Sequence, residues 1–70
     1  MASVLSPVTG SVWKIQVSVG DTVQEGDELM ILESMKMEIP VEAEEDGSVA
    51  AILCEEGESV ADGQALVELE

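Results

Sequence analysis

The 70-residue chain contains no histidine, no tyrosine and no phenylalanine, and it contains a single cysteine. Cys54 therefore cannot form a disulfide within the chain, and without histidine there is no Cys/His cluster that could bind zinc. Arginine is absent too, since both basic residues are lysines. These absences remove most of the side chains that enzymes use for general acid–base catalysis. The composition argues against an enzyme acting alone, and it predicts no catalytic residue and no metal site.

Positive charge is scarce as well, because two lysines stand against 16 acidic residues and the formal net charge is −14. Such a chain repels nucleic acid and anionic lipid, which argues against both as partners. No apolar stretch reaches the length needed to span a bilayer, so we expect neither a membrane segment nor a leader. Valine, isoleucine and leucine still supply 20 of the 70 residues. This share is above that of a disordered chain, and we expect a small folded domain.

The sequence contains an internal repeat with a shift of 37 positions. Residues 10–33 align with residues 47–70 without a gap, and ten of the 24 aligned positions are identical. All six glycines fall into aligned pairs, which are Gly10/Gly47, Gly20/Gly57 and Gly26/Gly63. Glycine is selected where the backbone needs positive φ or close approach, so paired glycines predict paired turns. We interpret residues 1–70 as one domain, with repeat halves 10–33 and 47–70 around a hairpin at 34–38.

Each half has the pattern of short strands separated by turns. The segment from Val12 to Val19 is rich in β-branched residues, and Leu29 to Leu32 is an apolar run of strand length. Residues 48–56 could form a short helix, but the aligned segment 11–19 is a poor helix former, so we predict strands in both. Leu29 and Leu32 have opposite parity along a strand, which indicates a bulge or a twist there.

Two all-β halves of this size cannot each bury an apolar face alone. We therefore predict that they pack against one another with pseudo-twofold symmetry, as a sandwich or flattened barrel of two thin sheets. Trp13 aligns with Ala50 and is expected to cover one edge of the core, while Cys54 aligns with Val17 and is expected to be a small core residue. The symmetry also predicts that the hairpin between the halves lies at one end of the molecule and the termini at the other.

The hairpin between the halves holds the unusual chemistry. Residues 33–38 read ESMKME and contain two of the four methionines and one of the two lysines. We expect Met35 and Lys36 near the tip of the hairpin. Glu33 and Glu38 flank Lys36 in the sequence, and we expect this amine to be a poor unassisted nucleophile. The position therefore suits an amine that another enzyme acylates.

The motif ESMKME, with Gly20 and Gly26 before it and Gly47 and Gly57 after it, resembles the biotinyl branch of the biotinyl/lipoyl attachment family over residues 4–70. The resemblance implies a flattened barrel of two four-stranded antiparallel sheets, the barrel-sandwich hybrid. Some members insert a protruding thumb in the first half. The gapless repeat leaves no room for one, so the chain is similar to the thumbless members.

The resemblance implies that a biotin–protein ligase biotinylates Lys36. The covalent biotin then carries carboxylate between a biotin carboxylase and a carboxyltransferase, and the chain is a non-enzymatic carrier in a carboxylase, decarboxylase or transcarboxylase system. Met35 and Met37 are the flanking methionines, for which packing and recognition by partners are both open. Glu38 has no counterpart in the repeat and is the candidate for a ligase contact. The expected setting is a monomeric domain in the cytoplasm, or in the mitochondrial matrix of a eukaryote.

Two other functions remain open from the sequence. A lipoyl carrier of a 2-oxoacid dehydrogenase or glycine cleavage system shares the family pattern, although such carriers usually have Asp-Lys-Ala at the tip where this chain has Met-Lys-Met. An unmodified interaction module is the third reading, but such a module has no reason to keep Lys36 at the tip.

Overall fold

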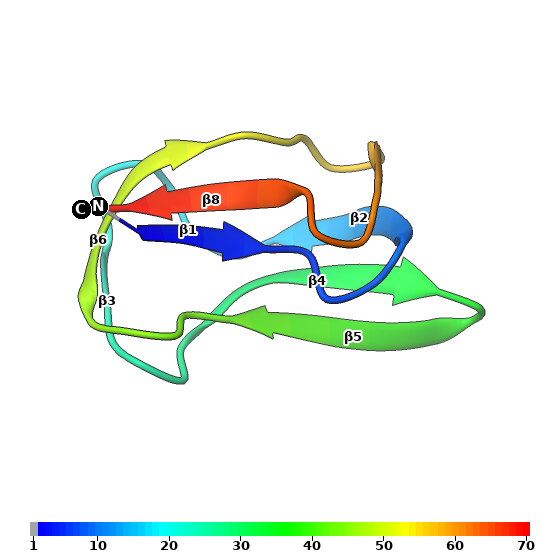
Figure 1. The fold of residues 1–70 in the computed structure, drawn as a ribbon, viewed down its shortest axis with the longest axis horizontal. Helices are drawn as coiled ribbons and strands as arrows, with labels where there is room; N and C mark the ends of the chain where they lie inside the picture. The colour runs from blue at the N-terminus through cyan, green and yellow to red at the C-terminus, as the bar shows by residue number, and fades with distance from the viewer. Residues whose placement is uncertain (1) are drawn as a thin grey trace.

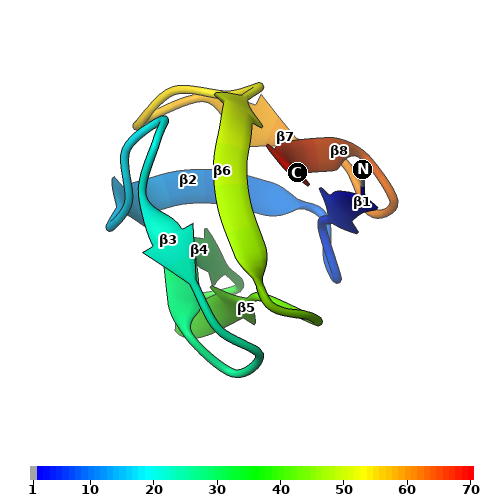
Figure 2. The ribbon, with the colours of Figure 1, turned by 90° about the vertical axis from the view of Figure 1, so that its left-hand side faces the viewer.

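The computed structural model describes residues 2–70, which form eight β-strands and no helix. The strands are β1 (Ala2–Leu5), β2 (Gly10–Ile15), β3 (Thr22–Val23), β4 (Glu28–Ser34), β5 (Met37–Glu42), β6 (Gly47–Ile52), β7 (Ser59–Val60) and β8 (Ala65–Leu69). They build two four-stranded sheets, β1-β8-β6-β3 and β5-β4-β2-β7, in which all neighbours are antiparallel. Figures 1 and 2 show the arrangement from two sides. The predicted fold class is confirmed.

A shift of 37 residues converts one sheet into the other, because it places β1 on β5, β2 on β6, β3 on β7 and β4 on β8. The hydrogen bonds repeat as well. The N–H of Gly20 donates to the carbonyl of Val49 at 2.8 Å, and the N–H of Gly57 donates to the carbonyl of Val12 at 2.7 Å. Gly20 and Gly57 have φ values of 99° and 87°. The prediction that these two glycines occupy like turns is confirmed.

The glycines that begin β2 and β6 have a different function from those in the turns, because they allow close backbone contact. A Cβ atom on Gly10 would collide with the backbone carbonyl of Glu33, and one on Gly47 would lie 2.9 Å from the carbonyl oxygen of Glu70. Neither glycine needs positive φ, so the absence of a side chain is the property that each position uses. Gly10 thereby lets β2 lie against the end of β4 that leads into the hairpin.

The core lies between the two sheets. It consists of Val4, Val12, Val23, Leu29, Met30, Leu32, Val41, Ala43, Val49, Cys54, Val60, Leu66, Val67 and Leu69. The register of β4 against β5 shifts between Glu28 and Met30, so Leu29, Met30 and Leu32 are all fully buried. The bulge expected from the two leucines is therefore present, although it lies at the start of the apolar run.

Two expectations about β2 need correction. The strand ends at Ile15 and does not continue to Val19, and the aligned strand β6 likewise ends at Ile52 and does not continue to residue 56. Beyond it, the N–H of Ser18 donates to the carboxylate of Asp21 at 2.8 Å, and such a side-chain acceptor competes with strand pairing. Trp13 does not cover the core, because 51% of it is exposed. It occupies the bulge at which the pairing of β2 with β4 shifts register.

The turn between β4 and β5 lies at one end of the elongated molecule, and both chain termini lie at the other (Figure 1). The termini are neighbours, since Ala2 of β1 pairs with Leu69 of β8. The predicted separation of hairpin and termini is confirmed. Across residues 2–70, the structure has no helix that is long and apolar enough to cross a membrane.

Candidate functional site

The hairpin turn consists of two residues, Met35 and Lys36. Ser34 pairs with Met37 across the turn, and the strands continue in register on both sides. Met35 and Lys36 have φ values of 51° and 65°, and they are the only non-glycine residues with positive φ among the described residues. Two-residue β-hairpins with this conformation favour Asn-Gly. Left-handed Met and Lys cost about 1 kcal/mol each, so the flanking strands must hold the turn in place.

The strand pairing provides this support. Six residue pairs join β4 to β5, and β4 also pairs with β2 on its other side. Next to the turn, the hydroxyl of Ser34 donates to the carbonyl of Thr9 at 2.9 Å. Gly10 allows the backbone of β2 to approach Glu33 closely. These contacts fix both sides of the turn and leave its two central residues in solvent.

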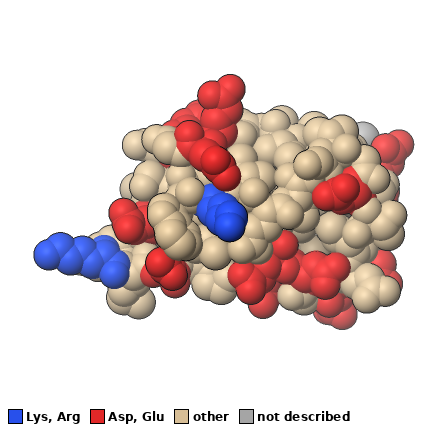
Figure 3. Space-filling view, turned by 180° about the vertical axis from the view of Figure 1, so that it is seen from behind, with Lys and Arg blue, Asp and Glu red and all other residues tan. Residues whose placement is uncertain are grey.

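The side chains of the turn are exposed. Met35 is 92% exposed, Met37 is 63% exposed, and Lys36 and Glu38 are exposed too. Figure 3 shows one of the two lysine side chains projecting beyond the end of the molecule, while the other lies against the middle of a face. The structure thus brings together all four residues singled out in the sequence, and it shows Met35 and Met37 packing little against the domain.

The two lysines differ in their setting. Lys36 lies in the turn, whereas Lys14 lies within β2 and is paired with Ile31 of the central strand β4. A residue in the middle of a sheet cannot enter a narrow active site unless the neighbouring strands enter with it. Lys36 can enter at the tip of a hairpin only two strands wide. The geometry therefore favours Lys36 as the amine that an enzyme acylates.

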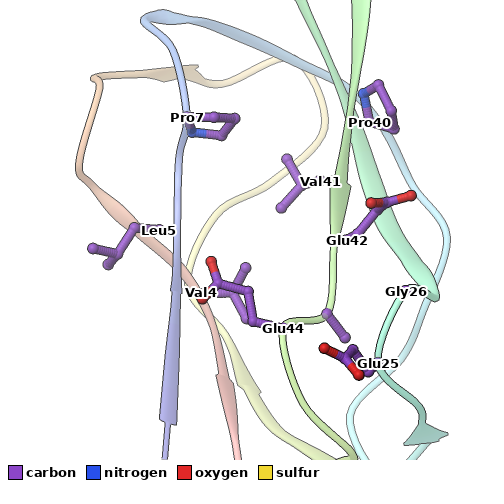
Figure 4. A pocket seen from close by; sticks show the side chains of 10 residues that line it. Val4, Leu5, Pro7, Glu25, Gly26, Pro40, Val41, Glu42 and Glu44 are labelled. Carbon is purple, nitrogen blue, oxygen red and sulfur yellow. The ribbon is translucent and has the colours of Figure 1, made fainter.

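A groove lies away from this turn. It has a volume of about 570 Å³ and lies between β1 and β5 (Figure 4). Its floor includes Val4 and Val41, and its walls include the carboxylates of Glu25, Glu42 and Glu44. Lys36 and its neighbours Met35, Met37 and Glu38 do not line it. The exposed lysine of the turn therefore lies outside this groove.

The thiol of Cys54 is buried in the core, with its Sγ 3.8 Å from the Sδ of Met30. Burial raises the pKa of Cys54, and the negative charge of Glu58 raises it further. A thiol in this setting is protonated and unreactive at neutral pH. Within residues 2–70, no three His, Cys, Asp or Glu side chains are grouped so as to hold a metal ion.

A family model described as "Biotin-requiring enzyme" matches residues 1–69. The chain belongs to this biotin/lipoyl attachment family. It is 45% identical over 62 residues to the "Biotin/lipoyl attachment protein" of Bacillus subtilis, a match that covers 89% of this chain and 85% of the relative. It is also 45% identical over 62 residues to the "Biotin carboxyl carrier protein" of Streptococcus mutans, covering 89% of this chain and 48% of the relative.

The family also includes domains of long chains. The chain is 43% identical over 65 residues to the human "Propionyl-CoA carboxylase alpha chain, mitochondrial", covering 93% of this chain and 9% of that relative. Among solved structures, the urea carboxylase of Kluyveromyces lactis contains a domain that matches with a TM-score of 0.93 and 36% identity, over 99% of this chain and 6% of that one. The family fold is thus shared by short proteins and by domains of large carboxylases.

Proposed function

We propose that biotin is attached to this chain as an amide on the side-chain nitrogen of Lys36. The chain is a biotin carrier and not itself a catalyst, as its family and its relatives named biotin carboxyl carrier protein support. The observation that carries the assignment of the residue is the two-residue turn, which holds Lys36 beside Met35 at the end of the molecule. An amide on an exposed amine needs no pocket in the domain, so the residues present fit the group.

The chain's own residues position the amine. Amide formation joins the nitrogen of Lys36 to the carboxyl carbon of biotin with overall loss of water, and a biotin–protein ligase must activate that carboxyl group. The turn holds the backbone of Lys36 in one conformation while its four-carbon side chain moves. When bound, biotin supplies a ring nitrogen that takes up and releases carboxylate. Tethering keeps this group at a high effective concentration near both enzymes that use it.

The relatives that are carboxylases support a place for this chain in a biotin-dependent carboxylase system, beside biotin carboxylase and carboxyltransferase components. A ligase partner and a monomeric state belong to the proposal. So does a reducing compartment, the cytoplasm or the mitochondrial matrix, which is consistent with one free buried cysteine. The lipoyl and interaction-module alternatives are not favoured, because the relatives include named biotin carriers.

The deciding experiment is intact-mass analysis of the chain coexpressed with a biotin–protein ligase. We expect one biotinyl increment in the wild type and in Lys14→Arg, and none in Lys36→Arg. The guanidinium group of arginine stays protonated and cannot accept the acyl group. Circular dichroism should show that both variants fold alike. An increment on Lys36→Arg would contradict the proposal, and a lipoyl increment with a lipoyl ligase alone would support the dehydrogenase carrier.

A further inference from the structure

The outer surface of the sheet β5-β4-β2-β7 carries an apolar patch near the Lys36 turn. Residues that pair directly in an antiparallel sheet project from the same face. Lys14, Ile31 and Pro40 form one such row across β2, β4 and β5. The neighbouring row, in which Val12 pairs with Leu32, faces the core. The row through Ile31 therefore faces outward, and Trp13 lies next to it at the bulge.

The other sheet provides an internal comparison for this surface. We name Trp13, Lys14, Ile31 and Pro40 the Trp13 face. The repeat places four residues at the equivalent positions of the sheet β1-β8-β6-β3, where Ala51 and Ser3 both pair with Glu68 and Ala50 occupies the bulge. These equivalents are Ala50, Ala51, Glu68 and Ser3. The same backbone thus accepts small and polar residues in one half and a large apolar group in the other.

The fold therefore does not require an exposed tryptophan at this bulge. Trp13 is 51% exposed, and the domain has no other aromatic residue. Exposed tryptophans that lie in apolar surroundings are the residues that most often dominate the energy of a protein–protein interface. Together with Ile31 and Pro40, the indole forms a surface that a partner with an apolar pocket can cover.

Charges around the Trp13 face indicate the chemistry of the partner. The exposed pair Glu33 and Glu38 lies on the side of the turn, and the exposed pair Glu28 and Glu42 lies on the far side. In Figure 3 one lysine lies in the middle of a face, and acidic side chains surround it, one of them directly against it. A complementary partner has an apolar pocket bordered by lysine or arginine.

We propose that the Trp13 face is the docking surface for the ligase that acylates Lys36, with Trp13 as its anchor. This inference rests on the proposed function. Pro40 is four residues from Lys36 along the hairpin, which corresponds to about 13 Å of strand. An enzyme that reacts with the lysine nitrogen itself must bring its active site to the turn, and it then covers the adjoining sheet. Enzymes that act at the end of a long arm need no such contact.

Steady-state kinetics of biotinylation, with purified ligase and the unmodified domain as the varied substrate, test the docking surface. We expect Trp13→Ala to raise KM about tenfold and to change kcat less than twofold, because the indole contributes to docking and not to the reaction. Exchange of all four residues for their equivalents, Trp13→Ala, Lys14→Ala, Ile31→Glu and Pro40→Ser, should raise KM further. Each replacement already occurs at the equivalent position of the other sheet, so these variants should fold.

A matched control moves the indole to the equivalent bulge. The double variant Trp13→Ala, Ala50→Trp should keep the high KM, because its tryptophan lies on the wrong face. Intact mass after long incubation should show complete biotinylation of every variant. Unchanged KM in Trp13→Ala, or recovery by Ala50→Trp, would overturn the docking inference while leaving Lys36 as the attachment site. An unmodified wild type would instead overturn the proposed function. Slower carboxyl transfer by biotinylated Trp13→Ala with unchanged ligase KM would assign the face to a carboxylase component and overturn the inference.

Discussion

The two ends of the molecule are built from the same repeat, but one is closed by a hairpin turn and the other carries the chain termini. At one end β4 continues through Met35 and Lys36 into β5, whereas at the other the equivalent strand β8 ends beside the start of β1. The core makes no such distinction, since Val12 and Leu32 are as buried as their counterparts Val49 and Leu69. Packing therefore requires the symmetry, and exposed positions are free to depart from it.

The strongest test of this comparison is substitution of the glycines that begin β2 and β6. Gly10→Ala forces a methyl group against the carbonyl of Glu33 within the sheet, and Gly47→Ala forces one against Glu70 at the chain end. We expect Gly10→Ala to lower the free energy of unfolding by about 2–3 kcal/mol and Gly47→Ala by about 1 kcal/mol. Urea denaturation of both variants measures the difference. Equal decreases in the free energy of unfolding would show that the end with the chain termini is packed as tightly as the end with the Lys36 turn.

The methionines of the turn have no counterparts at the other end. If they are read by partner enzymes, the double variant Met35→Leu, Met37→Leu should fold normally and be biotinylated. We expect it to transfer carboxylate about 3–10-fold more slowly, because leucine keeps the apolar bulk but loses the flexibility of methionine. Transfer rates with the matching carboxylase measure the effect. Wild-type rates would show that the thioethers are not recognised.

The backbone of the turn can be tested separately from its side chains. Met35→Gly removes the steric cost of positive φ from a residue that is 92% exposed and therefore loses little packing. We expect the free energy of unfolding to rise by about 0.5 kcal/mol, after the entropy of glycine in the unfolded chain is subtracted. Thermal melts measure the shift. A lower melting temperature would mean that contacts of Met35 stabilise the hairpin.

The smallest expected effect concerns the core position at which the halves carry cysteine and valine. Burial raises the pKa of Cys54, so the folded state keeps the thiol proton at a pH where the unfolded chain releases it. The resulting stability is complete below the unfolded pKa of about 8.5 and is lost as pH rises above it. Cys54→Val copies Val17 of the other half. The free energy of unfolding of this variant should fall less between pH 7 and pH 10 than that of the wild type. An identical fall in both proteins would show that groups other than Cys54 cause the pH dependence.

The sequence predicted what the glycines and the apolar pattern require. Paired glycines identified the like turns at Gly20 and Gly57, and the position of Lys36 between the halves placed it at one end. The left-handed turn could not be predicted, because Met-Lys lacks the Asn-Gly preference of such hairpins. The pairing of β4 with β5 and β2 imposes that conformation. These pairings involve residues distant in sequence, so the residues of the turn alone do not predict it.

Other features escaped prediction because equivalent positions use different residues. The repeat extends to Val4 and Val41, both 3% exposed, but few neighbouring residues there are identical. The hydroxyl of Thr9 accepts from the N–H of Asp62 at 3.1 Å, and its counterpart is the carboxylate of Asp46, which accepts from Glu25. Either oxygen can accept from the equivalent backbone N–H, so the hydrogen bond is conserved between the halves although the residue types differ.

The pairing of Ala2 with Leu69 brings both ends of the chain to one point, opposite the Lys36 turn (Figure 1). The molecule measures 30 × 19 × 18 Å, and its long axis joins these two points. A polypeptide fused to either terminus would therefore be attached at the end of the domain that lies farthest from Lys36. The distance from such a linker to the lysine then includes the full length of the rigid domain. The domain therefore lengthens the reach of a group on Lys36 without adding flexible residues, whose ordering would cost conformational entropy.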